Sequence, residues 1–411
     1  PTWGALFGAL AERQKREEEE LAAELAAGAQ SVVEVHGAQL AIMRHRGTAE
    51  LHRFAFDHCF HSQVPDADGD PAAAGGGGGN GSQQAVFDAL GAALLESAWH
   101  GVNATLFAYG QTGAGKSHSM IGSEGRPGVT SRLGDHLFHC VRRSLAESGG
   151  RNAHHVEVSC LEIYNEQVRD LSWGAKNRGA SLKVREAPGL GVFVDGLTYS
   201  VVASEEEMHQ AVLDAIEARV VGSTAMNAVS SRSHLIFTVL FASKVADPVT
   251  GGQIERQSKV NLIDLAGSER QGRTRVEGQR LKEGAQINKS LSTLGRVIHT
   301  LAKAAGAGAG EEGHPLEHVP FRDSLLTWLL KDSLGGNCRT AMLACLSPAA
   351  ASFEESLSTL RYANSAKRIT TKPVVNEDPT ARLINDLKAE IEALKKQLVA
   401  TQEAASPVPS P

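Results

Sequence analysis

A glycine-rich stretch at residues 110–117 has the residue types and spacing of a phosphate-binding loop. It reads Gly-Gln-Thr-Gly-Ala-Gly-Lys-Ser and follows an apolar run over residues 104–109 that predicts a strand. Its glycines let successive backbone N–H groups face phosphate oxygens, and a helix beginning near Lys116 adds the positive end of its dipole. Lys116 supplies a charge for the β- and γ-phosphates, and Ser117 supplies a hydroxyl ligand for Mg²⁺. The sequence therefore predicts a nucleotide site formed by Gly110, Gln111, Thr112, Gly113, Ala114, Gly115, Lys116 and Ser117.

Two further polar segments carry groups that suit phosphate chemistry. Residues 227–234 read Asn-Ala-Val-Ser-Ser-Arg-Ser-His and are expected in a loop before a strand. Residues 264–269 read Asp-Leu-Ala-Gly-Ser-Glu and follow a buried strand over residues 260–263. They offer a carboxylate for the water shell of a metal and a glycine N–H for a γ-phosphate. Because ligands collect at the carboxyl ends of strands in open α/β sheets, Gly110 and Asp264 should face one site.

The hydrophobic patterns predict the elements that position these segments. The content of β-branched residues rises over 31–43, and strands are expected over 51–60, 104–109, 156–164, 235–242, 260–263 and 340–346. Helices are expected over 86–99, from 116 onward, and over 205–220, 282–301, 324–332 and 353–369. This alternation predicts an α/β fold in which a central, mostly parallel, twisted sheet is flanked by helices on both faces.

Other segments lie outside this pattern. Residues 1–30 predict an acidic helical extension, and residues 66–82, with five consecutive glycines, predict a flexible insertion in a domain spanning 31–369. Within residues 380–402, apolar residues recur at spacings of three and four, which predicts either a short coiled coil or an amphipathic helix folded onto the domain. The Ser- and Pro-rich tail at 403–411 is expected to be disordered.

Composition limits the classes of function. The 411-residue chain has a formal net charge of −6, which argues against a generic nucleic-acid-binding protein. It has no apolar run long enough to span a bilayer and no secretory signal, so we expect no membrane insertion and a location in the cytoplasm. The five cysteines lack metal-ligand spacing and are expected to be reduced thiols.

Taken together, these motifs resemble the motor domain of a kinesin. The resemblance runs from about Val32 to Arg368 and rests on residues 108–118, on 227–234, which would be switch I, and on 264–269, which would be switch II. It is reinforced by Leu161-Glu-Ile-Tyr-Asn-Glu and by residues 281–291 and 318–324. The kinesin-three, or axonal-transport, class is the most similar class at three segments, Leu326-Thr-Trp-Leu-Leu, Ser358-Thr-Leu-Arg-Tyr-Ala and Val375-Asn-Glu-Asp-Pro. The resemblance implies the kinesin form of the P-loop NTPase fold, and a microtubule-based motor that couples microtubule-stimulated ATP hydrolysis to force or movement.

The resemblance also implies how ATP and Mg²⁺ are held. Ser117 and Ser231 would ligate Mg²⁺ directly, and Asp264 would act through a water. Ser230 would help to position or deprotonate the attacking water, with Asn227 in the same loop. These roles suit phosphoryl transfer, which depends on positioning and charge neutralisation more than on covalent chemistry.

Further roles concern the response to ATP. The Gly267 N–H would sense the γ-phosphate, and Arg232 and Glu269 would pair only when ATP has closed the two switches. A pair formed late contributes to the transition state rather than to resting affinity. His118 lies where a side chain stacks on adenine in some kinesins, and a packing histidine is the alternative.

The resemblance also indicates a partner and an output. The residues expected to bind acidic tubulin are basic, namely Lys183, Arg185, Arg273, Arg275, Arg280, Lys282, Lys289 and Arg322. Residues 370–379 would be a neck linker that docks when ATP closes the switches, and its C-terminal position favours plus-end movement. We therefore expect a cytoskeletal location, with a weak homodimer through residues 384–398 as one outcome of the apolar repeat.

Two departures from the kinesin pattern affect these expectations. Kinesins open with a strand bearing Arg-x-Arg-Pro that packs against adenine, whereas Arg44-His-Arg46 is followed here by Gly47. Either the chain is a fragment or misassembled product, or phosphate contacts alone hold the nucleotide. If this strand is missing beside the strand that precedes the phosphate-binding loop, an edge of the sheet should be exposed. The loop that carries a lysine cluster in the kinesin-three class has Lys303 and then Glu311-Glu312. We therefore expect weak, strongly salt-dependent microtubule affinity.

Two functions other than a motor would be consistent with parts of this sequence. A non-motile, microtubule-binding structural protein with impaired nucleotide turnover would fit the altered N-terminal region. The intact set of Lys116, Ser231, Arg232, Asp264 and Glu269 favours the motor instead. A P-loop GTPase is disfavoured because no Asn-Lys-x-Asp segment is present to read guanine.

Overall fold

The computed structural model describes most of the predicted domain and the segment that follows it. The described residues are 31–36, 39–43, 51–61, 79–80, 82–123, 125–172, 180–188, 191–221, 231–246, 253–269, 279–306 and 318–377. The predicted extension at 1–30, most of the insertion at 66–82, and the segments at 380–402 and 403–411 lie outside these residues.

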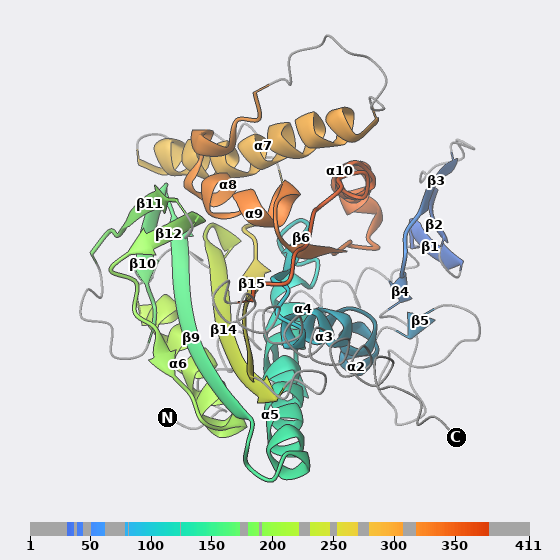
Figure 1. The fold of residues 1–411 in the computed structure, drawn as a ribbon. Helices are drawn as coiled ribbons and strands as arrows, with labels where there is room; N and C mark the ends of the chain where they lie inside the picture. The colour runs from blue at the N-terminus through green and yellow to red at the C-terminus, as the bar shows by residue number, and fades with distance from the viewer. Residues whose placement is uncertain are drawn as a thin grey trace, which may run out of the picture.

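A twisted central sheet forms the middle layer of the domain (Figure 1). Its strand order is β10-β9-β14-β15-β6-β16, with β13 also paired to β9. The strands are β6 (Ala104–Tyr109), β9 (Ala153–Tyr164), β10 (Gln167–Asp170), β13 (Ser200–Val201), β14 (His234–Ala246), β15 (Gln253–Asp264) and β16 (Arg339–Ala344). The expected α/β layering is present, and β6 has the predicted bounds.

The sheet is mixed, so the prediction of a mostly parallel sheet was wrong. Strand β6 pairs in parallel with β15 and β16, whereas β9–β10, β9–β13, β9–β14 and β14–β15 are antiparallel. Strand β14 runs against its two long neighbours, so β9, β15, β6 and β16 still share one direction. Hydrophobic periodicity marks where a strand lies and which faces are buried, but not the direction of its neighbour.

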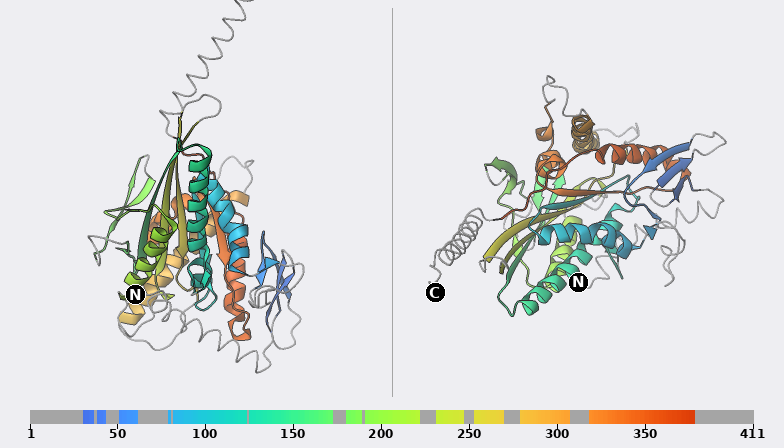
Figure 2. Two further views of the ribbon diagram at one scale, coloured as in Figure 1. Left: turned by 90° about the horizontal axis from the view of Figure 1, so that it is seen from below. Right: turned by 45° about the vertical axis from the view of Figure 1, so that its right-hand side comes forward.

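Helices cover both faces of the sheet (Figures 1 and 2). On one face lie α2 (Gln83–Val86), η1 (Phe87–Gly91), α3 (Ala92–Trp99), α4 (Lys116–Met120), α5 (Val129–Glu147) and α6 (Glu205–Val221). On the other lie α7 (Gln279–Gly306), α8 (Leu325–Leu329), α9 (Lys331–Gly335) and α10 (Phe353–Ala366), with the short turns η3 (Phe321–Asp323) and η4 (Ala350–Ser352). None of the helices in the described residues is long and apolar enough to cross a membrane.

The pleat of β6 divides the core into two layers. Leu106 and Ala108 pack with the helices of the α5 side, and Phe107 and Tyr109 pack with those of the α7 side. Every residue of β6 is buried, as expected for a strand covered on both faces. The strand is therefore held firmly where its carboxyl end meets the phosphate-binding loop.

A small antiparallel sheet lies beside α10 at the edge of the domain (Figure 1). It consists of β1 (Val33–His36), β2 (Gln39–Met43) and β3 (Leu51–Ala55). Val32 and Val33 pack on Phe353, Leu357 and Leu360, which joins it to the domain. Within the described residues β16 pairs only with β6, so it is the edge strand of the central sheet there. Strand β6 itself is paired on both sides, with β15 and β16, so the exposed edge expected beside it is absent among these residues.

Several element bounds differ from the prediction. The helix expected over 324–332 is split into α8 and α9 at Leu330, whose backbone leaves helical geometry, and α10 ends at Ala366. Helix α5 and the hairpin of β11 (Lys183–Ala187) and β12 (Gly191–Asp195) were not predicted. The remaining short strands are β4 (Phe60–His61), β5 (Gly79–Asn80), β7 (Gly122–Ser123) and β8 (Arg126–Pro127).

Candidate nucleotide site

The phosphate-binding loop links β6 to α4, as its sequence predicts. Gly110 follows β6 directly, and a side chain there would collide with the carbonyl oxygen of Cys345. Gly115 has φ of 91° at the entry to α4, a conformation that glycine adopts without strain. The Lys116 side chain is buried, and its Nζ donates to the carbonyl oxygens of Gly110 at 2.9 Å and Gln111 at 2.7 Å. The loop thus holds its lysine within reach of the position that phosphate oxygens would take.

The residues present fit a magnesium ion. Ser117 Oγ donates to Asp264 Oδ2 at 2.6 Å, which brings together a hydroxyl and a carboxylate from two elements. Asp264 is 3% exposed, and its Oδ1 has no hydrogen-bond partner among the described residues. A buried carboxylate oxygen left in this way is costly unless a cation or water meets it. Oxygen ligands of this kind suit Mg²⁺.

Switch II is hydrogen-bonded alternately to the phosphate-binding side and to switch I. Its Leu265 N–H points to the Ala108 carbonyl at 3.4 Å, and its Ser268 N–H donates to the Gly110 carbonyl at 3.0 Å. Between them, the Ala266 N–H donates to His234 Nδ1 at 3.0 Å, and the Gly267 N–H donates to the Ser231 carbonyl at 2.9 Å. The N–H that was expected to sense a γ-phosphate is therefore bonded to switch I in this structure.

Glu269 contacts the phosphate-binding loop rather than switch I. Its Oε2 accepts from the Thr112 N–H at 2.8 Å, and its Oε1 accepts from the Thr112 hydroxyl. Thr112 is thus the partner that the structure gives to both carboxylate oxygens of Glu269. The expected latch would require Glu269 to leave Thr112, so it stays a prediction for the ATP-bound form. Asn227 and Ser230 lie outside the described residues.

A buried charged group behind Asp264 was not anticipated from the sequence. Arg219 on α6 is 7% exposed and donates through Nη2 to the Ser233 carbonyl at 3.0 Å. Its guanidinium lies 3.6 Å from both Glu162 and Asp264. It therefore joins α6, β9, switch I and switch II. Glu162 interrupts an apolar strand, which is the one sequence signal that could have revealed this group.

The side where adenine was expected is described only in part. His118 lies on α4, and its carbonyl oxygen accepts from Gln83 Nε2 at 2.7 Å, which fixes α2 against α4. A role for the His118 ring at the base stays a prediction. Arg44 and Arg46 lie outside the described residues.

Comparison with known proteins now decides the family. The model of the kinesin motor domain matches residues 11–369 of the chain. This chain belongs to the kinesin motor domain family. It is 47% identical to human kinesin-like protein KIF13A over 86% of its own length, and 42% identical to rat kinesin-like protein KIF1B over 89%. Both relatives are of the kinesin-three class, which confirms the predicted class. The chain spans only 19% and 20% of these two proteins.

Solved structures of kinesins have the same fold. A dimer of KIF14 in its two-heads-bound state, with AMP-PNP and a microtubule, matches with a TM-score of 0.75 and 39% identity, covering 89% of this chain and 95% of that one. The structure of a fast kinesin matches with a TM-score of 0.69 and 35% identity, covering 87% and 91%. The central sheet with helices on both faces is thus the kinesin form of the P-loop NTPase fold.

The basic residues predicted to contact a microtubule are only partly described in this kinesin motor domain. Lys183 on β11 and Lys289 on α7 are exposed. Arg185 Nε lies 2.6 Å from Asp195 Oδ2 within the β11–β12 hairpin. Arg273, Arg275 and the side chains of Arg280 and Lys282 lie outside the described residues. The structure therefore leaves the assignment of this face as a prediction.

Arg322, another predicted contact, belongs to an exposed ion-pair cluster. Its Nη2 lies 2.7 Å from Glu186 Oε2, and its guanidinium lies 5.3 Å from the centre of the Trp328 ring. Lys331 Nζ lies 2.5 Å from the other Glu186 oxygen. Hydrogen bonds from Lys331 and Arg322 lower the pKa of Glu186 to about 2. The cluster ties the β11–β12 hairpin to the α8 region and offsets part of its positive charge.

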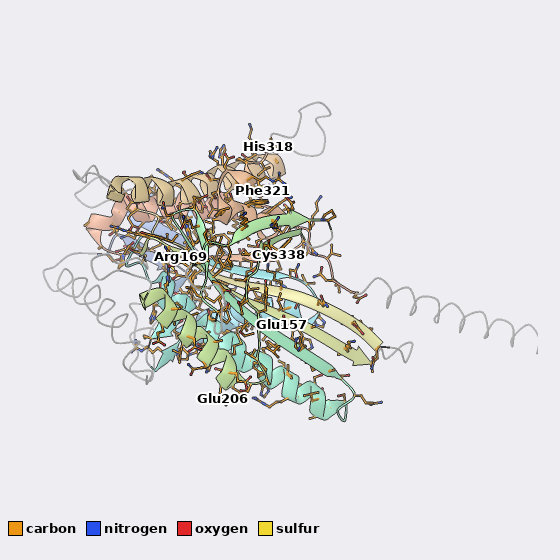
Figure 3. The ribbon with its side chains drawn as sticks, turned by 90° about the vertical axis from the view of Figure 1, so that its left-hand side faces the viewer. Glu157, Arg169, Glu206, His318, Phe321 and Cys338 are labelled. Atoms are coloured by element: carbon orange, nitrogen blue, oxygen red, sulfur yellow. The ribbon has the colours of Figure 1, made fainter. Side chains whose placement is uncertain are left out.

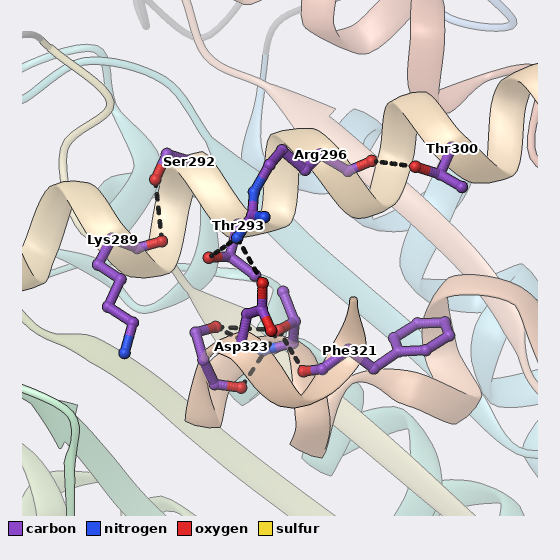
Figure 4. A network of polar contacts seen from close by, with 9 residues as sticks. Lys289, Ser292, Thr293, Arg296, Thr300, Phe321 and Asp323 are labelled. Atoms are coloured by element: carbon purple, nitrogen blue, oxygen red, sulfur yellow. Dashed lines mark hydrogen bonds and ion pairs between the residues drawn. The ribbon is translucent and has the colours of Figure 1, made fainter. Parts of the chain in front are cut away.

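The same side of the domain has a contact between α7 and the turn η3 (Figures 3 and 4). Arg296 Nη2 donates to Asp323 Oδ2 at 2.8 Å and to Thr293 Oγ1 at 3.2 Å. On the exposed side of α7, Ser292 Oγ donates to the Lys289 carbonyl at 3.1 Å. These bonds hold η3 along the helix.

The segment predicted as the neck linker lies against the core. The Asn376 N–H donates to the Gly101 carbonyl at 2.8 Å, and the Asn376 carbonyl accepts from the Gln257 N–H at 3.0 Å. Glu377 Oε1 lies 3.1 Å from Arg256 Nε. Residues 371–377 thus follow one path along the sheet and the end of α3, as a docked linker would.

Proposed function

We propose that this kinesin motor domain is a microtubule-stimulated ATPase that converts hydrolysis into movement or force. The observation that carries the proposal is the meeting of three segments at the carboxyl edge of the sheet. Asp264 bonds Ser117, the Gly267 N–H bonds Ser231, and the Ser268 N–H bonds the loop. The related KIF14 structure, which contains AMP-PNP and a microtubule, supports both ligands for this chain.

The residues of the site would act mainly by positioning. The loop amides and Lys116 would hold the phosphates, and Ser117, Ser231 and Asp264 would hold Mg²⁺. Bound Mg²⁺ supplies neutralisation of charge on the phosphate oxygens. To contact a γ-phosphate, the Gly267 N–H must leave the Ser231 carbonyl, to which it is bonded here. Switch closure would then depend on the terminal phosphate of ATP and would be reversed after hydrolysis.

The closing of the switches would also regroup the charged side chains. Glu269 would exchange Thr112 for Arg232, which would form the predicted latch only in the reactive state. Ser230 and Asn227 would complete switch I around the attacking water. The latch therefore adds to catalysis without raising the resting affinity for nucleotide.

The output would pass to the microtubule face and the neck linker. The exposed Lys183 and Lys289 would contact acidic tubulin, together with the other basic residues predicted for this face. The docked path of residues 371–377 from the C-terminal end of α10 supports plus-end movement. The chain would accordingly act on the cytoskeleton.

The test is steady-state ATP hydrolysis with and without microtubules, in the presence of Mg²⁺. We expect microtubules to stimulate the parent chain and Glu269→Ala to abolish the stimulation. Glu206→Ala is the matched control, because Glu206 is exposed in the first turn of α6 (Figure 3). Absence of stimulation in the parent chain would refute the motor proposal.

A non-motile microtubule-binding protein is the second candidate, because β16 is an edge strand within the described residues. An incomplete sheet beside the nucleotide site would impair exchange while leaving microtubule binding intact. Stopped-flow release of a fluorescent ADP analogue separates the two candidates. Release accelerated by microtubules supports the motor, and release unaffected by bound microtubules supports the structural protein.

A further inference from the structure

His234 lies where switch I, switch II and helix α7 meet. It is the first residue of β14 and the last residue of the switch I sequence at 227–234. Its ring is 2% exposed, and it bonds Ala266 of switch II through Nδ1 at 3.0 Å and Ser290 Oγ of α7 through Nε2 at 2.8 Å. The role predicted for the 227–234 loop does not use this side chain.

The chemistry of the two partners assigns the tautomer. The Ala266 backbone N–H is a donor only, so His234 Nδ1 must accept and therefore carries no proton. The proton of the neutral ring then lies on Nε2, which donates to the Ser290 hydroxyl. A protonated ring would lose the Ala266 bond. Burial is the main cause that lowers the pKa of His234 to about 3, so the ring stays neutral at physiological pH.

The two bonds connect switch II, which ATP is expected to move, to helix α7, which is predicted to face the microtubule. Ala266 precedes Gly267, whose N–H must leave Ser231 before it can meet a γ-phosphate. Ser290 is itself 2% exposed, and Leu294 and Val297 on the same helix are fully buried. A displacement of switch II at Ala266 would therefore act on a helix that is packed into the core, rather than on a side chain that can rotate freely.

We propose that His234 is a positioning residue that transmits the rearrangement of switch II to α7 through the Ala266–His234–Ser290 chain of hydrogen bonds. This inference deepens the proposed function and rests on it, because the output of α7 is microtubule-stimulated turnover. A histidine that merely satisfied buried polar groups would contribute to stability but not to nucleotide-dependent changes in α7.

The first test measures hydrogen–deuterium exchange in peptides from α7, without microtubules, in Mg²⁺ with ADP or AMP-PNP. Ser290→Ala removes the hydroxyl and leaves the His234–Ala266 bond. Ser292→Ala is the matched control on the same helix, because Ser292 is exposed and its Oγ bonds only its own turn at the Lys289 carbonyl. We expect a nucleotide-dependent difference in the parent chain and the control, and its loss in Ser290→Ala.

The outcomes of this test separate the inference from the proposed function. An undiminished difference in Ser290→Ala would overturn the relay, and so would the absence of any difference in the parent chain. If the difference is lost in Ser290→Ala while microtubules fail to stimulate the parent, the relay stands and the motor proposal fails.

The second test measures ATP hydrolysis. We expect Ser290→Ala to keep the basal rate and to lower the microtubule-stimulated kcat about fivefold, as for one lost hydrogen bond. Ser290→Thr keeps the hydroxyl and should restore the rate. His234→Asn keeps an acceptor for Ala266 but is too short to reach Ser290, so it should match Ser290→Ala and add nothing to it in the double variant. Additive losses in the double variant would contradict the relay.

Discussion

The carboxylate of Glu269 is held by Thr112 of the phosphate-binding loop, with Oε2 2.8 Å from the Thr112 backbone nitrogen. In this structure, the residue expected to complete the ATP-bound latch is therefore engaged by the phosphate-binding loop. Since the Gly267 N–H is likewise bonded to Ser231, two groups must change partner when the switches close. The structure thus resembles a resting arrangement that competes with the reactive one.

This competition predicts the effect of Thr112→Val. The substitution keeps the backbone N–H but removes the hydroxyl that bonds Glu269 Oε1, so the resting arrangement loses one charge-assisted bond. We expect the basal ATPase rate to rise about two- to fivefold, because Glu269 is released to Arg232 more readily. Steady-state hydrolysis without microtubules checks this. A lowered rate with unchanged nucleotide affinity would contradict the competition.

The Glu186 cluster predicts a gain in microtubule affinity. Glu186→Gln removes the charge that pairs with Arg322 and Lys331, which leaves two cations for acidic tubulin. Co-sedimentation at fixed ionic strength should show binding about threefold tighter, a modest gain because exposed ion pairs are weak. Because the pKa of Glu186 is lowered to about 2, this carboxylate contributes no pH dependence under ordinary assay conditions. Glu206→Gln is the control, and an equal gain there would indicate a net-charge effect only.

The buried ring of His234 predicts how stability depends on pH. The pKa of His234 is lowered from 6.5 to about 3, so the unfolded chain binds the proton more tightly. The contribution of the neutral His234 ring to the free energy of unfolding is therefore present above pH 6.5 and is lost as the pH falls toward 3. Between pH 7.5 and 5.5 the parent chain should lose about 1.4 kcal/mol of unfolding free energy relative to His234→Asn. Urea unfolding at these pH values measures the free energy of unfolding of both chains. The same change with pH in the parent chain and in His234→Asn would refute a buried neutral ring.

Local signals were enough to predict the parts of the site that follow one another in the chain. The apolar run of β6 and the glycines after it predicted the strand, the loop and the start of α4, and all three are present. The strand that ends at Asp264 was likewise predicted to reach the same edge, and the parallel pairing of Asp264 with Ala108 confirms it. The family resemblance added the roles of these residues.

The contacts that join distant segments could not be predicted. Glu162, Arg219 and Asp264 meet only because β9, α6 and β15 pack around one point, and nothing local in the sequence distinguishes Arg219 from an exposed charged residue at the end of a helix. The reversed direction of β14 has no local signature either. Helix α5 is different, because Val129, Leu133 and Leu137 recur every four residues and mark its buried face. That helix could have been predicted from the same rule that revealed the others.

The docked segment predicts which residue couples the linker to the core. The Asn376 side chain donates to the Gly101 carbonyl at 2.9 Å and to Asn103 Oδ1 at 3.2 Å, and it accepts from Asn337 Nδ2 at 2.8 Å, in addition to the two backbone bonds of Asn376. Neighbouring Val374 is 60% exposed, so its side chain adds little to docking. Asn376→Ala therefore removes three side-chain hydrogen bonds, whereas Val374→Ala removes none and is the matched control.

If docking of residues 371–377 drives movement, Asn376→Ala should uncouple movement from hydrolysis. Three lost hydrogen bonds of about 1 kcal/mol each would shift the docking equilibrium by about two orders of magnitude toward the undocked linker. We expect microtubule gliding velocity to fall several-fold while microtubule-stimulated ATPase persists, because Asn376 lies at Gly101 and Asn337, away from Lys116 and Asp264. Gliding and ATPase measured on one preparation decide the point. Equal loss of both would show that Asn376 supports the nucleotide site instead, and unchanged gliding would show that docking at this residue does not limit movement.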